Sequence, residues 1–203
     1  MTENAFPPLL DPATAPFPTI AAWMNEAAEH ELNDPTAVAL ATVDSRGRPS
    51  VRMVLAKAVG PDGVVFFTNL QSRKGTDLHG NPNAALLWHW KSLRRQVRIE
   101  GRAQKVTPAE ADRYFASRHP ESRRGALASD QSRPMPDREA FERRVEELRA
   151  RYGDDDIPRP GYWSGFRIMP EAVELWQDRP HRLHDRVRWE KTEAGWNGTR
   201  LFP

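Results

Sequence analysis

The alternation of hydrophobic and polar positions predicts a mainly β chain with helices on its flanks. Short hydrophobic runs bounded by turn residues predict five strands in the first half, at residues 37–43, 51–59, 64–69, 84–90 and 96–106. The first three runs follow one another without an intervening helix, so we expect them to pair as an antiparallel meander. In the fifth run, Gln96, Arg98 and Glu100 fall on one face and Val97 and Ile99 on the other.

The C-terminal part of the chain has a similar pattern. Residues 163–176 contain two short strand candidates, and residues 182–189 and 196–202 predict a closing hairpin. If the chain is extended from Arg182 onward, successive side chains alternate between faces. Arg182, His184 and Arg186 then lie on one face, with Leu183, Val187 and Trp189 on the other.

Helical patterns separate these runs. Helices are predicted over 19–31, over 73–80 after a Ser72 cap, from the capping box at 107–110 to about 118, and over 136–152. Residues 119–135 are expected to be irregular, with one short helix. Residues 1–17 are rich in proline and predict a flexible N-terminal arm. Residues 18–203 then form a single domain of α+β class, an antiparallel barrel or sandwich with helical insertions near 107–152.

The amino-acid composition excludes several kinds of functional site and disfavours one class of partner. The 203 residues contain 30 Lys and Arg against 28 Asp and Glu, and no cysteine. The absence of cysteine excludes disulfides, thiol nucleophiles, zinc–thiolate sites and iron–sulfur clusters. The near-neutral net charge of +2 disfavours nucleic acid as a partner. No apolar run suits a membrane span and the N-terminus does not resemble a signal peptide, so we expect no membrane association and a cytoplasmic location.

Common catalytic motifs are missing. The sequence has no glycine-rich nucleotide loop, no GxSxG and no HExxH. His181 and His184 have a spacing that could ligate a metal from a helix, but no carboxylate cluster completes the set. We therefore predict no metal site.

Positive charge instead gathers at predicted strand ends and at a helix start. Ser72, Arg73 and Lys74 begin a short helix, where free N–H groups and the helix dipole favour an anion. Thr68 and Asn69 add hydrogen-bonding groups just before it. The alternative is that Arg73 and Lys74 are solvated surface residues.

A second candidate anion site lies in the helix predicted after residue 107. Tyr114 and Arg118 share a helical face, and Ser122 continues the row. Taken alone, this pattern is more typical of a surface aromatic–Arg pair. Two phosphate-sized sites would imply two phosphorylated ligands.

Several blocks of the chain together resemble the pyridoxamine 5′-phosphate oxidase family. The resemblance runs from about Asp34 to Pro203, and its most specific blocks are residues 52–57, 68–74, 95–97, 114–118 and 174–186. It implies an FMN-binding antiparallel split β-barrel that forms a homodimer, with FMN in the cleft between subunits.

The resemblance also implies roles for individual residues. The implied FMN-binding residues are Arg52, Met53, Val54, Leu55, Lys57, Phe67, Thr68, Arg73, Lys74, Gln96, Gln131, Ser132, Trp176 and Arg186. The substrate phosphate is expected to bind Lys57, Tyr114, Arg118 and Ser122. Arg182 and His184 are expected beside the pyridine ring as the catalytic pair, with Arg182 positioning the substrate and His184 orienting it by a hydrogen bond. Phe67 and Leu175 depart from the family pattern, which has a tyrosine and an aromatic residue at these positions.

The activity implied by the resemblance is oxidation of pyridoxamine and pyridoxine 5′-phosphates to pyridoxal 5′-phosphate. A hydride would pass from substrate C4′ to flavin N5, and O2 would be reduced to H2O2. One alternative is a related split-barrel flavin oxidase that acts on another aromatic substrate, such as a phenazine precursor. Another is a non-catalytic protein that binds flavin or pyridoxal phosphate.

Overall fold

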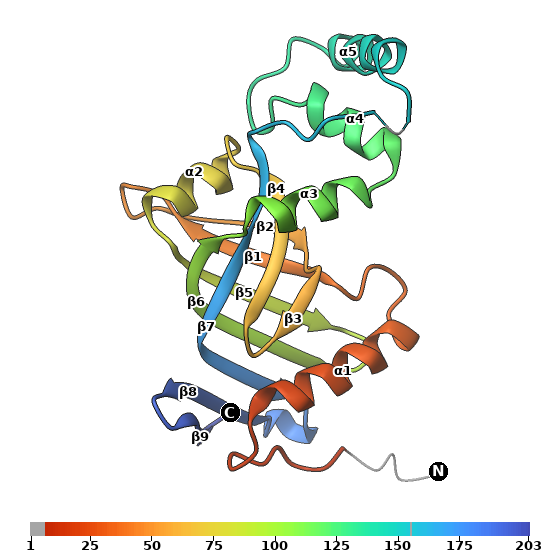
Figure 1. Ribbon diagram of the computed structural model, residues 1–203. Helices are drawn as coiled ribbons and strands as arrows, with labels where there is room; N and C mark the ends of the chain where they lie inside the picture. The colour runs from red at the N-terminus through yellow and green to blue at the C-terminus, as the bar shows by residue number, and fades with distance from the viewer. Residues whose placement is uncertain (1–6, 155) are drawn as a thin grey trace.

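The computed structural model describes residues 7–154 and 156–203, and within them nine strands form one antiparallel sheet (Figure 1). The strands are β1 (Ala37–Val43), β2 (Pro49–Leu55), β3 (Ala58–Gly60), β4 (Gly63–Asn69), β5 (Asn83–Trp90), β6 (Arg95–Lys105), β7 (Trp163–Gln177), β8 (Asp185–Thr192) and β9 (Gly195–Leu201). The helices are α1 (Pro16–His30), α2 (Arg73–Gly80), α3 (Pro108–Ala116), α4 (Pro120–Ala128), α5 (Arg138–Arg151) and the 3-10 turn η1 (Pro180–Arg182).

Strand β7 organises the sheet, because it pairs with three other strands. The main strand order is β2-β1-β5-β6-β7-β4-β3, and β8 and β9 continue from β7. β7 pairs with β6 along its length, with β4 over residues 163–168 and with β8 over residues 172–177. A register shift between Glu100 and Gly101 marks a bulge in the β6–β7 ladder. Only glycine fits at position 101, because a Cβ there would lie 1.9 Å from the Met169 carbonyl oxygen.

The prediction of a single strand over residues 51–59 is wrong. The structure has two strands there, β2 and β3, and between them the chain leaves the β1–β2 pair and enters the β3–β4 pair. Ala56 N–H donates to Thr36 O at 3.0 Å, whereas Lys57 N–H donates to Val65 O at 2.7 Å. The expected meander is therefore two separate hairpins, β1–β2 and β3–β4.

Two C-terminal predictions also differ from the structure. Residues 163–177 form one long strand, because the bulge lets pairing continue past Pro170. The hairpin of β8 and β9 is confirmed, but β8 begins at Asp185. Arg182 is not extended, since η1 holds His181 and Arg182 at φ of 56° and 64°. Arg182, His184 and Arg186 therefore do not form one row on a strand face.

The core forms where alternate strand residues meet under α1. Val38 and Leu40 of β1 are fully buried, and so are Val97 and Ile99 of β6, as their alternation predicts. Ile20 of α1 is 1 % exposed and packs in the same cluster. Burying a side chain of that size contributes roughly 1.5–3 kcal/mol.

The described part of the predicted N-terminal arm is attached to β7 and β8. Leu10 is buried, and its N–H donates to Asp185 Oδ2 at 2.7 Å. The Pro8 carbonyl accepts from Gln177 Nε2 at 2.8 Å, and the Pro12 carbonyl accepts from Trp189 Nε1 at 3.1 Å. The helix expected from residue 19 begins at Pro16. Residues 1–6 of the predicted arm lie outside the described residues.

Helices α3, α4 and α5 gather at the end of the sheet opposite α1, β8 and β9 (Figure 1). The predicted capping box at Thr107 and Glu110 is present, and Asp137 caps α5 through the Ala140 N–H at 2.6 Å. α5 has no fully buried residue, and its predicted stripe, which includes Phe141 and Leu148, is only half-buried. Within residues 7–154 and 156–203, no helix is long and apolar enough to cross a membrane.

Candidate active site

A cleft of about 510 Å³ opens between β2, β4 and the helices α2, α3 and α4. Eleven of the predicted site residues line it: Met53, Val54, Leu55, Lys57, Phe67, Thr68, Lys74, Tyr114, Arg118, Ser122 and Gln131. The structure therefore brings the predicted substrate-phosphate set together with eight of the fourteen predicted cofactor residues. Other lining residues were not predicted, among them Gly125, Ala126, Ser129, Phe141 and Trp163.

One wall of the cleft is a stack of aromatic rings. Phe67 lies 4.0 Å from Tyr114 and 5.6 Å from Trp163, measured between ring centroids, and both pairs are stacked. The ammonium group of Lys57 lies 5.9 Å from the Tyr114 centroid. Flat walls of this kind suit planar aromatic ligands. Trp163 was missed because it lies 96 positions from Phe67, and no local pattern connects the two.

Arg118 brings a positive charge to this cleft. Its guanidinium carbon lies 5.0 Å from the Trp163 ring centroid, and burial lowers its pKa from the usual value, with a smaller opposing effect from Tyr114. Its Nη1 is buried and has no hydrogen-bond partner among the described residues. A buried cationic donor without a partner is costly. The arrangement therefore fits an anionic ligand such as a phosphate.

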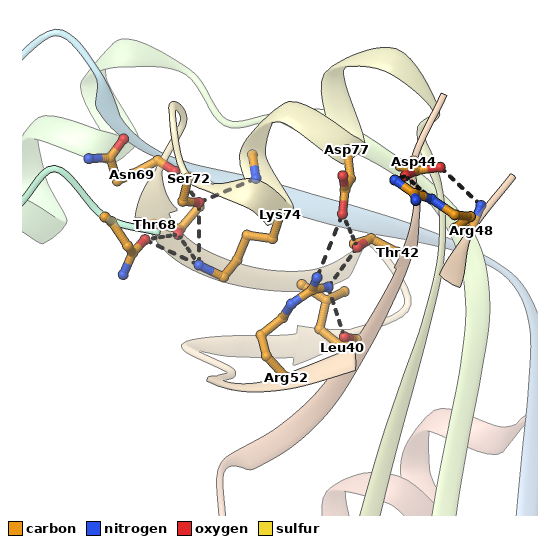
Figure 2. Close-up of polar contacts among 12 residues, drawn as sticks. Leu40, Thr42, Asp44, Arg48, Arg52, Thr68, Asn69, Ser72, Lys74 and Asp77 are labelled. Atoms are coloured by element: carbon orange, nitrogen blue, oxygen red, sulfur yellow. Dashed lines mark hydrogen bonds and ion pairs between the residues drawn. The ribbon is translucent and has the colours of Figure 1, made fainter. Parts of the chain in front are cut away.

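Lys74 provides a second cationic group, from the first turn of α2. Figure 2 shows its side chain reaching back toward Thr68 and Ser72. Its Nζ lies 3.2 Å from Thr68 Oγ1, 3.3 Å from Ser72 Oγ and 3.1 Å from Gln131 Oε1. Ser72 caps the helix as predicted, accepting from the Gly75 N–H at 3.3 Å. Burial, and then the charge of Arg52, lower the pKa of Lys74.

Arg52 is held in place by residues that the sequence did not indicate. Its Nη1 donates to Thr42 Oγ1 at 2.7 Å, and its Nη2 lies 3.6 Å from Asp77 Oδ2 (Figure 2). Thr42 in turn donates to Asp77 at 2.7 Å, and both side chains are buried. Burial lowers the pKa of Arg52, and Asp77 opposes this effect. The carboxylate thus fixes Arg52 beside Lys74, which increases the positive potential at the start of α2.

Arg73 and Ser132 do not line the cleft. They border a neighbouring hollow of about 780 Å³, which also contains Arg46 and Arg48. Gln131 lines both spaces and joins them. Ser132 has a φ of 72°, so the chain turns sharply directly after Gln131.

The remaining predicted cofactor residues lie in a separate hollow of about 240 Å³. Gln96, Trp176 and Arg186 line it, together with Arg98 and Glu174. Glu174 is 6 % exposed and binds both arginines, with Arg186 Nη2 at 2.7 Å and Arg98 Nη2 at 2.5 Å. The buried carboxylate therefore orients two guanidinium groups at this hollow.

The predicted catalytic residues, Arg182 and His184, come shortly after Trp176 of this hollow in the sequence. Arg182 is exposed in η1, whereas the His184 ring packs 4.7 Å from the Trp176 ring. His184 Nδ1 lies 2.9 Å from Asp178 Oδ1.

The two groups of site residues lie at opposite ends of β7 (Figure 1). Trp163, in the cleft, and Trp176, in the second hollow, are separated by roughly 40 Å of strand at about 3.3 Å per residue. One copy of the chain therefore does not bring Arg182 or His184 to Arg118.

Two family models match the chain. One, described as pyridoxamine 5′-phosphate oxidase, matches residues 24–152. The other, described as the pyridoxine 5′-phosphate oxidase C-terminal dimerisation region, matches residues 163–203.

Named relatives match over nearly the whole length. The chain is 59% identical to the pyridoxine/pyridoxamine 5′-phosphate oxidase of Gluconobacter oxydans, over 97% of this chain and 98% of that protein. It is 53% identical to the protein of the same name from Caulobacter vibrioides, over 99% and 90%.

Solved structures show the same fold. PhzG from Burkholderia lata 383, in complex with tetrahydrophenazine-1-carboxylic acid, superposes with a TM-score of 0.89 at 33% identity and covers 95% of each chain. An FMN-binding, pyridoxamine 5′-phosphate oxidase-related protein from Nostoc punctiforme superposes with a TM-score of 0.76 at 18% identity, covering 94% of this chain and 100% of that one. These similarities confirm the predicted split-barrel class.

Proposed function

The chain belongs to the pyridoxamine 5′-phosphate oxidase family, and from this premise we propose that it is an FMN-dependent oxidase that converts pyridoxamine and pyridoxine 5′-phosphates to pyridoxal 5′-phosphate. The observation that carries the proposal is the aromatic cleft with two separate cationic positions, Arg118 at one and Lys74 with Arg52 at the other. Two phosphorylated ligands, cofactor and substrate, require two such positions.

The residues in and around the cleft divide between these ligands. Arg52, Arg73 and Lys74 neutralise the FMN phosphate, and Thr68 and Gln131 donate hydrogen bonds to the cofactor. Lys57, Tyr114, Arg118 and Ser122 hold the substrate phosphate. The backbone and side chains of Met53, Val54, Leu55 and Phe67 line the flavin ring.

FMN, when bound, supplies the redox chemistry, which is acceptance of a hydride from substrate C4′ at flavin N5 and reduction of O2 to H2O2. The chain contributes binding, orientation and charge neutralisation. Holding the substrate phosphate fixes C4′ relative to the flavin, and a fixed geometry lowers the barrier of the chemical step. Arg182 positions the substrate ring and stabilises developing negative charge, and His184 orients the reacting group.

We propose that the working unit is a homodimer, in which Gln96, Trp176, Arg182, His184 and Arg186 complete the cleft of the partner subunit. The distance along β7 supports this arrangement, because one chain does not bring these residues to its own cleft. The family description of residues 163–203 as a dimerisation region supports it as well. Residues 18–203 then act as one domain, with the helices of 107–152 inserted beside the cleft.

The first test is purification followed by oxygen consumption. We expect a yellow protein that consumes O2 with pyridoxamine 5′-phosphate, because the cleft binds both phosphorylated molecules. A colourless protein that binds no added FMN would contradict the proposal.

A second candidate function is oxidation of an unphosphorylated aromatic compound, because PhzG has the same fold and binds a tetrahydrophenazine carboxylic acid. Such a substrate would not need the set formed by Lys57, Tyr114, Arg118 and Ser122, which favours the phosphorylated substrates. A yellow protein that turns over a reduced phenazine carboxylate but neither vitamin phosphate would support this second function.

FMN affinity should fall as the pH rises through the lowered pKa of Lys74. An anion beside Lys74 favours the protonated amine, so binding raises this pKa and takes up a proton. The attraction is therefore complete below the pKa of the free protein and declines above it, in a window that begins below the usual value of about 10.4. Titrating apoprotein with FMN from neutral to alkaline pH, followed by flavin fluorescence, measures the change.

Lys74→Met separates this effect from general alkaline instability. Losing a charge-assisted hydrogen bond of about 1.5–3 kcal/mol should weaken FMN at neutral pH roughly 10- to 150-fold. The variant should also lose the pH dependence in this window, whereas Lys91→Met, at an exposed position, should retain it. An identical pH dependence in Lys74→Met would contradict the assignment.

A further inference from the structure

The loop between β7 and β8 contains a carboxylate to which the proposed function gives no role. Asp178 directly follows β7, and its Oδ1 lies 2.9 Å from His184 Nδ1. Both side chains are largely buried, at 13% and 19% exposure. The contact is therefore protected from solvent competition, unlike an ion pair at the surface.

Asp178 is fixed from its other side by the turn between β5 and β6. Arg94 of that turn forms an ion pair with the Asp178 carboxylate, and the Asp178 N–H donates to the Arg94 carbonyl at 3.0 Å. Arg94 has a φ of 54°, so the turn itself has a defined shape. One contact from this separate element thus involves the carboxylate and the other the backbone of Asp178, and together they orient the residue.

The shorter contact of Nδ1 favours one protonation pattern of the His184 ring. The Arg179 N–H also lies within hydrogen-bonding distance of Nδ1, at 3.4 Å, and would require an unprotonated Nδ1, but the Asp178 carboxylate is closer, at 2.9 Å. A carboxylate accepts and does not donate, so Nδ1 carries the proton and Nε2 is the acceptor in the neutral ring. Trp176, at 4.7 Å between centroids, packs against the ring and limits its rotation.

We propose that Asp178, braced by Arg94, is a positioning residue that holds His184 in the Nδ1–H tautomer, so that Nε2 accepts a hydrogen bond from the substituent on substrate C4′. This inference rests on the proposed function. It accounts for both substrates of that function, because a hydroxyl and an ammonium group are each hydrogen-bond donors. It also defines the class of group that the loop accepts, which is a hydrogen-bond donor such as a hydroxyl or amino group.

The first arm of the test reads the tautomer directly and needs no turnover. Long-range ¹H–¹⁵N spectra of the purified dimer, taken where His184 is neutral, should show protonated Nδ1 in the wild type. Asp178→Ala should shift the His184 signal toward the Nε2–H form, and Asp62→Asn, at an exposed turn, should leave it unchanged. An unchanged tautomer in Asp178→Ala overturns the inference, whether or not the protein is an oxidase.

The second arm separates positioning from a structural role. Asp178→Ala should lower kcat roughly tenfold to a hundredfold, as loss of one hydrogen bond to a charged group does. FMN content, dimer assembly and KM should stay close to the wild-type values. Asp178→Asn, which retains an acceptor oxygen, should restore part of kcat. Loss of FMN or of the dimer together with turnover would assign Asp178 a structural role and overturn the proposal. If the wild type itself shows no turnover, the proposed function fails and the tautomer arm alone decides the inference.

Discussion

Replacing Arg118 with alanine is expected to lower kcat/KM for pyridoxamine 5′-phosphate by a factor of roughly thirty to several thousand. The range corresponds to about 2–5 kcal/mol, the usual effect of removing one partner of a buried charge pair. Arg118 suits this role because its Nη1 is buried without a partner among the described residues, so this donor is available to a ligand. Most of the loss should appear in KM, because the phosphate is bound in both ground and transition states.

The choice of substrate and control makes this measurement specific. With unphosphorylated pyridoxamine, Arg118→Ala and the wild type should differ far less, because the missing contact is to the phosphate. Arg113→Ala, on the exposed side of α3, which ends two residues before Arg118, controls for effects on that helix and should resemble the wild type. Equal losses for phosphorylated and unphosphorylated substrates would show that Arg118 does not bind the phosphate.

Mixing two variants that each have a low kcat/KM is expected to restore activity, measured at a substrate concentration below the KM of the variants. In the proposed dimer, each site combines Arg118 of one chain with Arg182 of the other. A mixed dimer of Arg118→Ala and Arg182→Ala chains then has one doubly defective site and one intact site. Random reassortment of equal amounts makes about half of all dimers mixed, so roughly a quarter of wild-type activity should return.

The assay requires co-expression of the two variants or refolding of them together, followed by measurement of oxygen consumption per bound FMN. Each variant treated alone gives the baseline. The two variants combined in one chain, mixed with wild type, provide the matched control. Those mixed dimers have two singly defective sites, so reassortment should lower the activity of this sample from about half to about a quarter of the wild-type value. If the two single variants mix without any recovery, Arg118 and Arg182 act within the same chain and the proposed dimer is wrong.

Local patterns in the sequence predicted local structure well. The Ser72 cap, the capping box at Thr107 and the alternation in β6 depend on residues a few positions apart, and the structure has all three. The cleft residues of β2, and Phe67 of β4, were found through the family resemblance. Thr68 and Tyr114 were candidates from their spacing, but for Tyr114 the spacing alone was more typical of a surface aromatic–Arg pair.

The features that were missed depend on contacts between distant segments. The break between β2 and β3 follows from hydrogen bonds to Thr36 and Val65, and neither is visible in the run at 51–59. Asp77 supports Arg52 and Thr42 across 25 and 35 positions. The positive φ angles at His181 and Arg182 override the extended conformation that alternation suggested, and they occur at residues that lack the usual glycine signal.

The bulge in the β6–β7 ladder divides β7 into two halves of similar length. Pairing with β4 ends at Ile168 and pairing with β8 starts at Ala172, so the residues between them are paired only to β6. The strand extends roughly 20 Å to either side of this point, and a rotation of about 5° there would displace each end by nearly 2 Å. One end carries Trp163 of the cleft and the other leads to His184. In the proposed dimer, the bulge at Gly101 therefore defines the angle between the two parts of the site that each subunit contributes.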